Sequence, residues 1–149
     1  MFIYSIIIKQ KKDDLLRLNN MKIQINFFNE KFIEAIGAGI YKISIRYNDK
    51  QELLYIGESE FVLVRCAAHL YELKKKPEYL GFDKNSIENE KIVLDFALIE
   101  QKEKQHQRRK LEIQYIDIYK PIMQSGIKDR MKSIEEKKAA LKSFLGDEE

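Results

Sequence analysis

The stretch GIYKISIRYNDKQELLYIG, residues 39–57, constrains the fold most strongly because it predicts a β-hairpin. Two segments rich in Ile, Tyr and Leu, residues 40–47 and 52–56, flank the turn-forming run NDKQ. Strands joined by so short a connection pair antiparallel. Gly-Ile-Tyr opens the hairpin and Tyr-Ile-Gly closes it, so Tyr41 and Tyr55 are expected to project from one face of a small sheet.

Two helices are expected after the hairpin. The first covers residues 60–74, with Ser59 as its N-cap and Pro77 enforcing its end. The second covers residues 103–119 and stops before Pro121.

The remaining segments complete a mixed pattern. Residues 91–99, rich in Ile, Val, Leu and Phe, predict a third strand. Residues 29–36 predict two helical turns capped by Asn29, residues 78–90 a polar loop, and residues 128–145 a charged amphipathic helix. We therefore expect an α+β fold, with a small three-stranded antiparallel sheet flanked by helices.

The first eight residues are apolar but too few to span a bilayer, and positive charges follow them. A signal peptide carries its positive charge before the apolar run. We therefore expect an additional strand or a packing segment in a cytoplasmic protein without a membrane partner. The single cysteine, Cys66, excludes an internal disulfide framework and suits a reducing compartment.

Positive charge gathers in the C-terminal third of the chain. Residues 101–145 contain 12 Lys and Arg against 6 Asp and Glu, whereas the whole chain carries a net charge of only +3. Such a distribution suits a polyanionic partner. The simpler interpretation is a set of solvated helix faces.

Three polar residues lie in otherwise apolar helical patterns. Arg65 and His69 are one turn apart and share a polar stripe between two apolar stripes. Glu112 shares a face with Tyr and Ile side chains, where a carboxylate either borders the core or holds a positive group. For each residue taken alone, an ordinary exposed helix surface is the favoured interpretation.

Taken together, these features resemble the GIY-YIG nuclease superfamily. Both name-giving tripeptides are intact and in order, and the resemblance covers residues 37–125. Arg65 follows Gly57 by eight residues, where the family places its catalytic Arg. Glu112 lies in LEIQYIDIYKPIMQS, which looks like the family's helix with a metal-binding Glu that ends at Lys-Pro.

The resemblance divides the chain into an N-terminal extension (1–36), a nuclease-like domain (37–125) and a C-terminal helical extension (126–149). The 13 residues between the two tripeptides form a slightly longer linker than is usual in the family. Gln124 stands where the family usually has Asn, and it keeps the amide group but adds a methylene.

The resemblance also implies roles for individual residues. Tyr41 acts as, or assists, the general base, and His69 shares that role. Tyr55 hydrogen-bonds the phosphate or the attacking water, and Arg65 neutralises charge developing on the phosphate. Glu112 binds one divalent ion, Mg²⁺ or Mn²⁺. Gln124 completes the site, and the glycines beside the tyrosines leave room for a phosphate backbone.

The activity implied is metal-dependent endonucleolytic cleavage of double-stranded DNA. Lysine and arginine side chains would bind the phosphates without sequence preference. The candidates are Lys74, Lys75, Lys76, Arg108, Arg109 and Lys110. Specific cleavage would need a loop insertion, a homodimer, or a larger repair or restriction assembly. The alternative function, favoured by Gln124, is a non-catalytic module with a nuclease-like fold that binds nucleic acid or protein.

Overall fold

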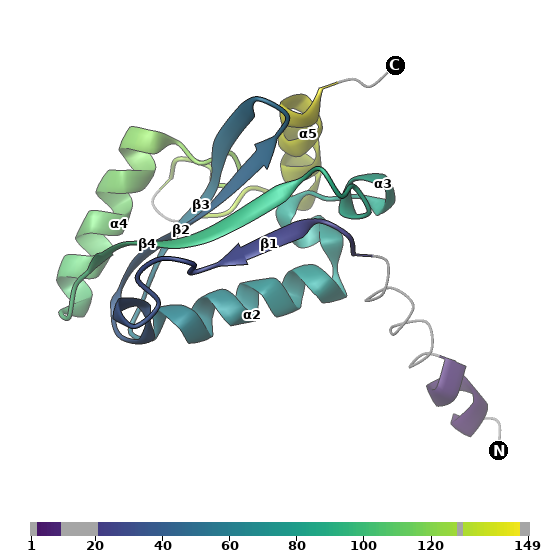
Figure 1. Ribbon diagram of the computed structural model, residues 1–149, viewed down its shortest axis with the longest axis horizontal. Helices are drawn as coiled ribbons and strands as arrows, with labels where there is room; N and C mark the ends of the chain where they lie inside the picture. The colour runs from purple at the N-terminus through teal and green to yellow at the C-terminus, as the bar shows by residue number, and fades with distance from the viewer. Residues whose placement is uncertain (1–2, 10–20, 128–129, 147–149) are drawn as a thin grey trace.

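The computed structural model describes residues 3–9, 21–127 and 130–146, and its centre is a four-stranded mixed sheet (Figure 1). The strand order is β1-β4-β2-β3. The strands are β1 (Gln24–Phe27), β2 (Gly39–Tyr47), β3 (Lys50–Ser59) and β4 (Val93–Gln101). Strand β2 pairs antiparallel with both β3 and β4, whereas β1 pairs parallel with β4. The α+β class is confirmed, but the sheet has a fourth strand that the sequence did not reveal, because its four residues are too few to establish an alternating pattern.

Helices cover both faces of the sheet and one of its ends (Figure 1). They are η1 (Glu34–Ile36), α2 (Val62–Lys75), η2 (Pro77–Leu80), α3 (Lys84–Ile87), α4 (Gln105–Tyr119) and α5 (Ile134–Leu145). The larger core lies on the α2 side of the sheet, and a smaller one joins Ile40 and Ile56 to Ile116 of α4. No helix among the described residues is long and apolar enough to cross a bilayer.

The hairpin is confirmed, with a tighter turn than expected. Strand β2 ends at Tyr47 and β3 begins at Lys50, so that only Asn48 and Asp49 connect them. Asn48 takes the left-handed conformation, with φ of 55°, which Asn tolerates better than most residues. The outer edge of β3 is covered because the backbone N–H groups of Ile122 and Met123 donate to carbonyls of β3.

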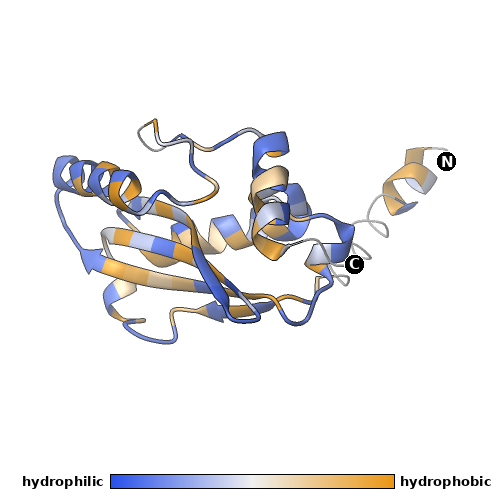
Figure 2. Ribbon diagram, turned by 90° about the horizontal axis from the view of Figure 1, so that it is seen from above, coloured by the Kyte–Doolittle hydropathy of each residue, from blue (hydrophilic) through white to orange (hydrophobic). Residues whose placement is uncertain are grey.

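Two expectations for the N-terminal part were wrong. Residues 3–9 form a short exposed helix instead of a strand or a packed segment, and its ribbon is largely orange in Figure 2 because most of its residues are apolar. A short apolar run has no periodicity that separates helix from strand. The helical turns expected at 29–36 shrink to η1, whose N-cap is Ile33 rather than Asn29.

The later helices also differ in detail from the expectation. Phe61, not Ser59, is the N-cap of α2, although the Ser59 hydroxyl accepts the Phe61 N–H. The expected polar loop at 78–90 contains η2 and α3. Helix α5 begins only at Ile134, where Ser133 and Glu136 form a capping box, and it packs against η2.

Candidate active site

The two hairpin tyrosines meet on the α2 face of the sheet. Tyr41 on β2 pairs with Gly57 on β3, and Tyr55 pairs with Ile43, so the tyrosines lie diagonally across the two strands. Their ring centroids are 6.1 Å apart. A β-bulge between Ile40 and Tyr41 shifts the register against β4 at this point, and bulges of this kind redirect the neighbouring side chain. The expectation that both tyrosines share a face is confirmed.

The hairpin glycines serve this packing rather than an incoming phosphate. A Cβ atom built on Gly57 would overlap the hydroxyl and ring of Tyr41, so the space beside this glycine is already filled by that side chain. A Cβ on Gly39 would lie 2.5 Å from the backbone oxygen of Glu100, which indicates close approach of β4. The expectation that the glycines leave room for a phosphate backbone was therefore wrong.

His69 of α2 is the centre of the polar cluster. Its Nε2 lies 2.7 Å from the Tyr41 hydroxyl, and its Nδ1 lies 2.8 Å from the hydroxyl of Tyr79 on η2. The Tyr55 ring packs against the imidazole at a centroid distance of 4.9 Å. Both Tyr41 and His69 are only 1% exposed. Sequence reasoning missed Tyr79 because it lies in the segment expected to be a polar loop, and no motif marks it.

Arg65 forms the exposed rim of this cluster. It precedes His69 by one helical turn, and its positive charge acts on the hydroxyls of Tyr41, Tyr55 and Tyr79 and opposes the rise of their pKa values. One of the two apolar stripes of this helix, the one that includes Phe61 and Val64, does not face the core, because both residues are exposed. The structure thus brings together Tyr41, Tyr55, Arg65 and His69.

Burial keeps the cluster neutral at pH 7, apart from the Arg65 guanidinium. Desolvation raises the pKa of Tyr41 far above its usual value, and the nearby Arg65 opposes this shift without reversing it. Desolvation, with the charge of Glu112 adding to it, raises the pKa of Tyr55 to about 12. Desolvation and then the charge of Arg65 lower the pKa of His69 to about 4. Tyrosine hydroxyls and a neutral imidazole are therefore the resting forms.

Glu112 lies in the opposite layer of the fold. It lies on α4, is only 6% exposed, and acts electrostatically on Tyr55. Within the described part of the chain, no group of three or more His, Cys, Asp or Glu side chains could hold a metal ion. Mg²⁺ commonly takes one or two carboxylates and completes its shell with water and substrate phosphate. A single inward-facing carboxylate therefore fits an ion that binds together with a phosphate.

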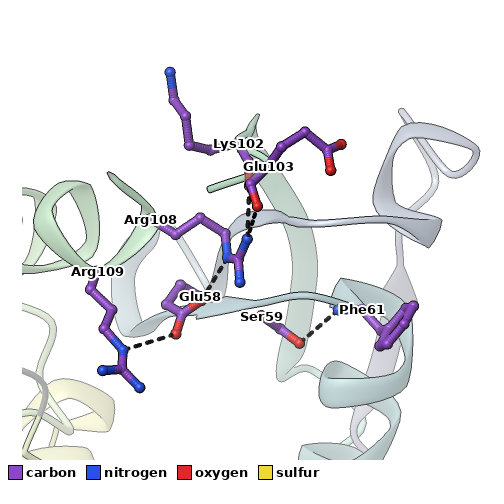
Figure 3. Close-up of polar contacts among 7 residues, drawn as sticks. All are labelled: Glu58, Ser59, Phe61, Lys102, Glu103, Arg108 and Arg109. Carbon is purple, nitrogen blue, oxygen red and sulfur yellow. Dashed lines mark hydrogen bonds and ion pairs between the residues drawn. The ribbon is translucent and has the colours of Figure 1, made fainter. Parts of the chain in front are cut away.

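Arg108 was expected to contact phosphate, but the structure uses it internally (Figure 3). Its Nε donates to the Glu58 carboxylate at 2.8 Å, and its Nη1 donates to the backbone oxygens of Lys102 and Glu103. The residue is 3% exposed, so its guanidinium is not available at the surface. These bonds fix the first turn of α4 against the end of β3, one helical turn before Glu112.

Gln124 also has an internal role. Its Oε1 accepts the Ile56 N–H at 3.0 Å, and its Nε2 donates to the Ile56 carbonyl at 2.8 Å. The side chain is buried, and both ends of its amide are occupied. Gln124 therefore pairs with β3 like an additional strand residue and holds the backbone between Tyr55 and Gly57.

The other predicted basic residues are exposed. They are Lys74, Lys75 and Lys76 at the end of α2, and Arg109 and Lys110 on α4. Because α2 and α4 cover opposite faces of the sheet (Figure 1), these residues form two separate clusters.

Comparison of the chain with protein-family models, curated proteins and solved structures finds no match. The inference of function therefore rests on the geometry described above and on the sequence motifs.

Proposed function

We propose that the protein is a metal-dependent endonuclease that hydrolyses phosphodiester bonds in DNA. The observation that carries the proposal is the contact between the Tyr41 hydroxyl and His69 Nε2, with Arg65 exposed beside it. A phosphodiester at this rim would meet the Arg65 cation, with the Tyr41 hydroxyl and the His69 base buried directly behind it. The resemblance of the hairpin, Arg65 and Glu112 to the GIY-YIG nucleases supports the same assignment.

The raised pKa of Tyr41 argues against a stable tyrosinate as the base. Instead, the Tyr41 oxygen would take a proton from the attacking water while its own proton passes to His69 Nε2. Arg65 would release Tyr41 and donate to the non-bridging phosphate oxygens, where negative charge develops. The negative charge of the bound phosphate would raise the low pKa of His69 and so make it a better proton acceptor.

Glu112 is the residue that would hold the divalent ion, together with oxygen atoms of the bound phosphate. Such an ion supplies charge neutralisation at the phosphate and lowers the pKa of a coordinated water. Burial, with the charge of Glu112 adding to it, raises the pKa of Tyr55, so its hydroxyl stays protonated and would be able to donate to the phosphate.

A second candidate function is a non-catalytic binding module with this fold. The burial of Tyr41 and His69 favours it, because a fully hydrogen-bonded Tyr–His pair can also serve only to stabilise a core. Gln124 no longer favours it, because its amide binds the backbone of β3 rather than the cluster. In the binding module, DNA affinity would not depend on Glu112.

Cleavage of supercoiled plasmid distinguishes the two functions. The protein is incubated with Mg²⁺, Mn²⁺ or EDTA, alongside Glu112→Ala and Tyr41→Phe. We expect metal-dependent nicking that each substitution lowers by at least about 10²-fold. The matched controls are Asp117→Ala, exposed on the same helix as Glu112, and Tyr119→Phe, which is also exposed, and both should nick like the wild type.

A wild-type protein that leaves the plasmid intact with every metal, yet retards it on a gel, contradicts the nuclease and supports the binding module. Retention of nicking by Glu112→Ala would contradict the role assigned to that carboxylate.

A further inference from the structure

We propose that Tyr79 is a positioning residue that holds His69 in the tautomer with its proton on Nδ1, which leaves Nε2 free to accept the Tyr41 proton. The tautomer is inferred from the two contacts of the ring nitrogens and from the position of the Arg65 charge. Its catalytic consequence rests on the proposed nuclease function.

The starting observation is that both ring nitrogens of His69 have one partner each. Tyr41 lies at Nε2 and Tyr79 lies at Nδ1, at 2.7 and 2.8 Å. A neutral imidazole has one N–H donor and one acceptor nitrogen, so one tyrosine must donate to the ring and the other must accept from it. His69 can assist Tyr41 as a base only if Nε2 is the acceptor.

Arg65 decides the direction on the Tyr41 side. The positive charge of Arg65 acts on the Tyr41 hydroxyl and favours release of its proton, and a guanidinium cannot accept that proton. That proton has two neighbours, His69 Nε2 and the Tyr55 hydroxyl. Imidazole nitrogen is much more basic than a phenol oxygen, so the proton points to Nε2. Nδ1 then carries the ring proton and donates it to Tyr79.

Tyr79 is held in place by the C-terminal helix. The ammonium group of Lys137 on α5 donates to the Tyr79 backbone oxygen at 2.7 Å and lies 5.2 Å from the centroid of the Tyr79 ring. Lys137 is buried, and burial lowers its pKa. The backbone and ring of Tyr79 are thus both fixed, so its hydroxyl stays opposite Nδ1.

The imidazole ring of His69 does not need to rotate or exchange partners during proton transfer. Water gives one proton to the Tyr41 oxygen, Tyr41 gives its own proton to Nε2, and the Nδ1 proton stays on Nδ1, hydrogen-bonded to the Tyr79 oxygen. The resulting imidazolium has two N–H donors, and both acceptors are already in place. The hydroxide oxygen forms the new bond to phosphorus, the bond to the leaving oxygen breaks, and solvent protonates that oxygen.

The tautomer is measured by ¹⁵N NMR of the imidazole rings in the protein without DNA. The chain has two histidines, so Gln at position 69 (His69→Gln) assigns the signals, and exposed His106 serves as the internal reference. We expect protonated Nδ1 and unprotonated Nε2 for His69. In Tyr79→Phe, Nδ1–H would lose its acceptor, and we expect the proton to move to Nε2. Wild-type His69 with its proton on Nε2 overturns the proposal.

Nicking kinetics test the consequence. Tyr79→Phe should lower kcat by about 10²-fold with KM unchanged, because DNA binding does not involve His69. Lys137→Met should lower kcat less and give a mixture of tautomers, and Tyr119→Phe should change neither readout. Unchanged kcat in Tyr79→Phe overturns the catalytic consequence. If Tyr79→Phe fails to fold, the wild-type ¹⁵N spectrum still tests the tautomer of His69, and Lys137→Met still tests its effect on kcat.

The two proposals fail separately. A wild-type protein that does not cut DNA removes the nuclease assignment, while the ¹⁵N spectrum still accepts or rejects the role of Tyr79 in setting the tautomer.

Discussion

The two faces of the hairpin bury neighbouring residues to a similar degree but use them differently. Ile40 and Ile56 point toward α4 and pack with Ile116 in an apolar cluster. Tyr41 and Tyr55, which are the adjacent residues on the two strands, point toward α2 and meet the imidazole of His69. Burial alone therefore does not distinguish the two faces, whereas the polar partners of Tyr41 and Tyr55 on α2 do.

The two faces of the hairpin also differ in the arginine that lies beside each of them. Arg108 on the α4 side is buried, and its donors are used by Glu58 and by backbone carbonyls. Arg65 on the α2 side stays exposed while it contacts Tyr41. A buried, fully bonded guanidinium stabilises the fold, whereas an exposed one can still transfer its hydrogen bonds to a ligand.

The largest effect should come from Arg65→Ala. We expect plasmid nicking to fall by about 10³-fold, or roughly 4 kcal/mol in the barrier, because a donor to the developing phosphate charge is lost. The free energy of unfolding in urea should change by less than about 0.5 kcal/mol, since the side chain is exposed. Arg46→Ala, which removes only a surface ion pair with Asp95, is the matched control and should nick normally. Equal losses in the two variants would contradict the role of Arg65.

The opposite result is expected for Arg108→Ala. Removing one partner of a buried ion pair leaves the Glu58 carboxylate uncompensated, so the free energy of unfolding should fall by about 3–4 kcal/mol. Arg109→Ala is the natural control. Arg109 is exposed and lies 3.9 Å from the same carboxylate, so its removal should cost less than about 0.5 kcal/mol. Similar losses in the free energy of unfolding would contradict the conclusion that Arg108 stabilises the fold and Arg109 does not.

Acid should weaken the α2 face through His69. Its pKa is about 4 in the folded protein, and its ordinary value is 6.5. Between these values the unfolded chain binds the additional proton, so stability is complete above about pH 6.5 and falls by about 3 kcal/mol toward pH 4. The charged group facing the imidazole is Arg65, and the others are the hydroxyls of Tyr41, Tyr55 and Tyr79.

Urea unfolding at a series of pH values measures this dependence. His69→Gln should lose most of the slope between pH 6.5 and 4. Asp83 and Asp95, whose pKa values are lowered from 3.8 by hydrogen bonds to Ser86 and to Arg46, contribute only near pH 4, and they do so equally in the wild type and in His69→Gln. An unchanged slope in His69→Gln would contradict the assignment.

A smaller effect should follow from Gly57→Ala. The added Cβ would overlap the Tyr41 hydroxyl and displace the ring from His69, which should destabilise the protein by about 2 kcal/mol and reduce nicking. Gly37→Ala is the control, since a Cβ at Gly37 meets no atom within 4 Å. If Gly57→Ala leaves the His69 ¹⁵N signals unchanged, the packing explanation for this glycine is wrong.

The sequence by itself determined the elements whose signal is local. The alternation of residues 40–47 and 52–56 predicted the hairpin and its shared tyrosine face, and four-residue spacing predicted that Arg65 and His69 lie one turn apart. Turn and proline signals placed the main helices to within a few residues.

Only the tertiary structure decided which faces are covered and which side chains meet. Arg108 and Arg109 are chemically identical neighbours, yet only one is buried against Glu58. Tyr79 reaches His69 because η2 packs against both α2 and α5. Gly57 is needed because the Tyr41 side chain occupies the space where a Cβ atom would lie. The physical reason is that periodicity fixes which residues share a face, whereas long-range packing fixes what lies opposite that face.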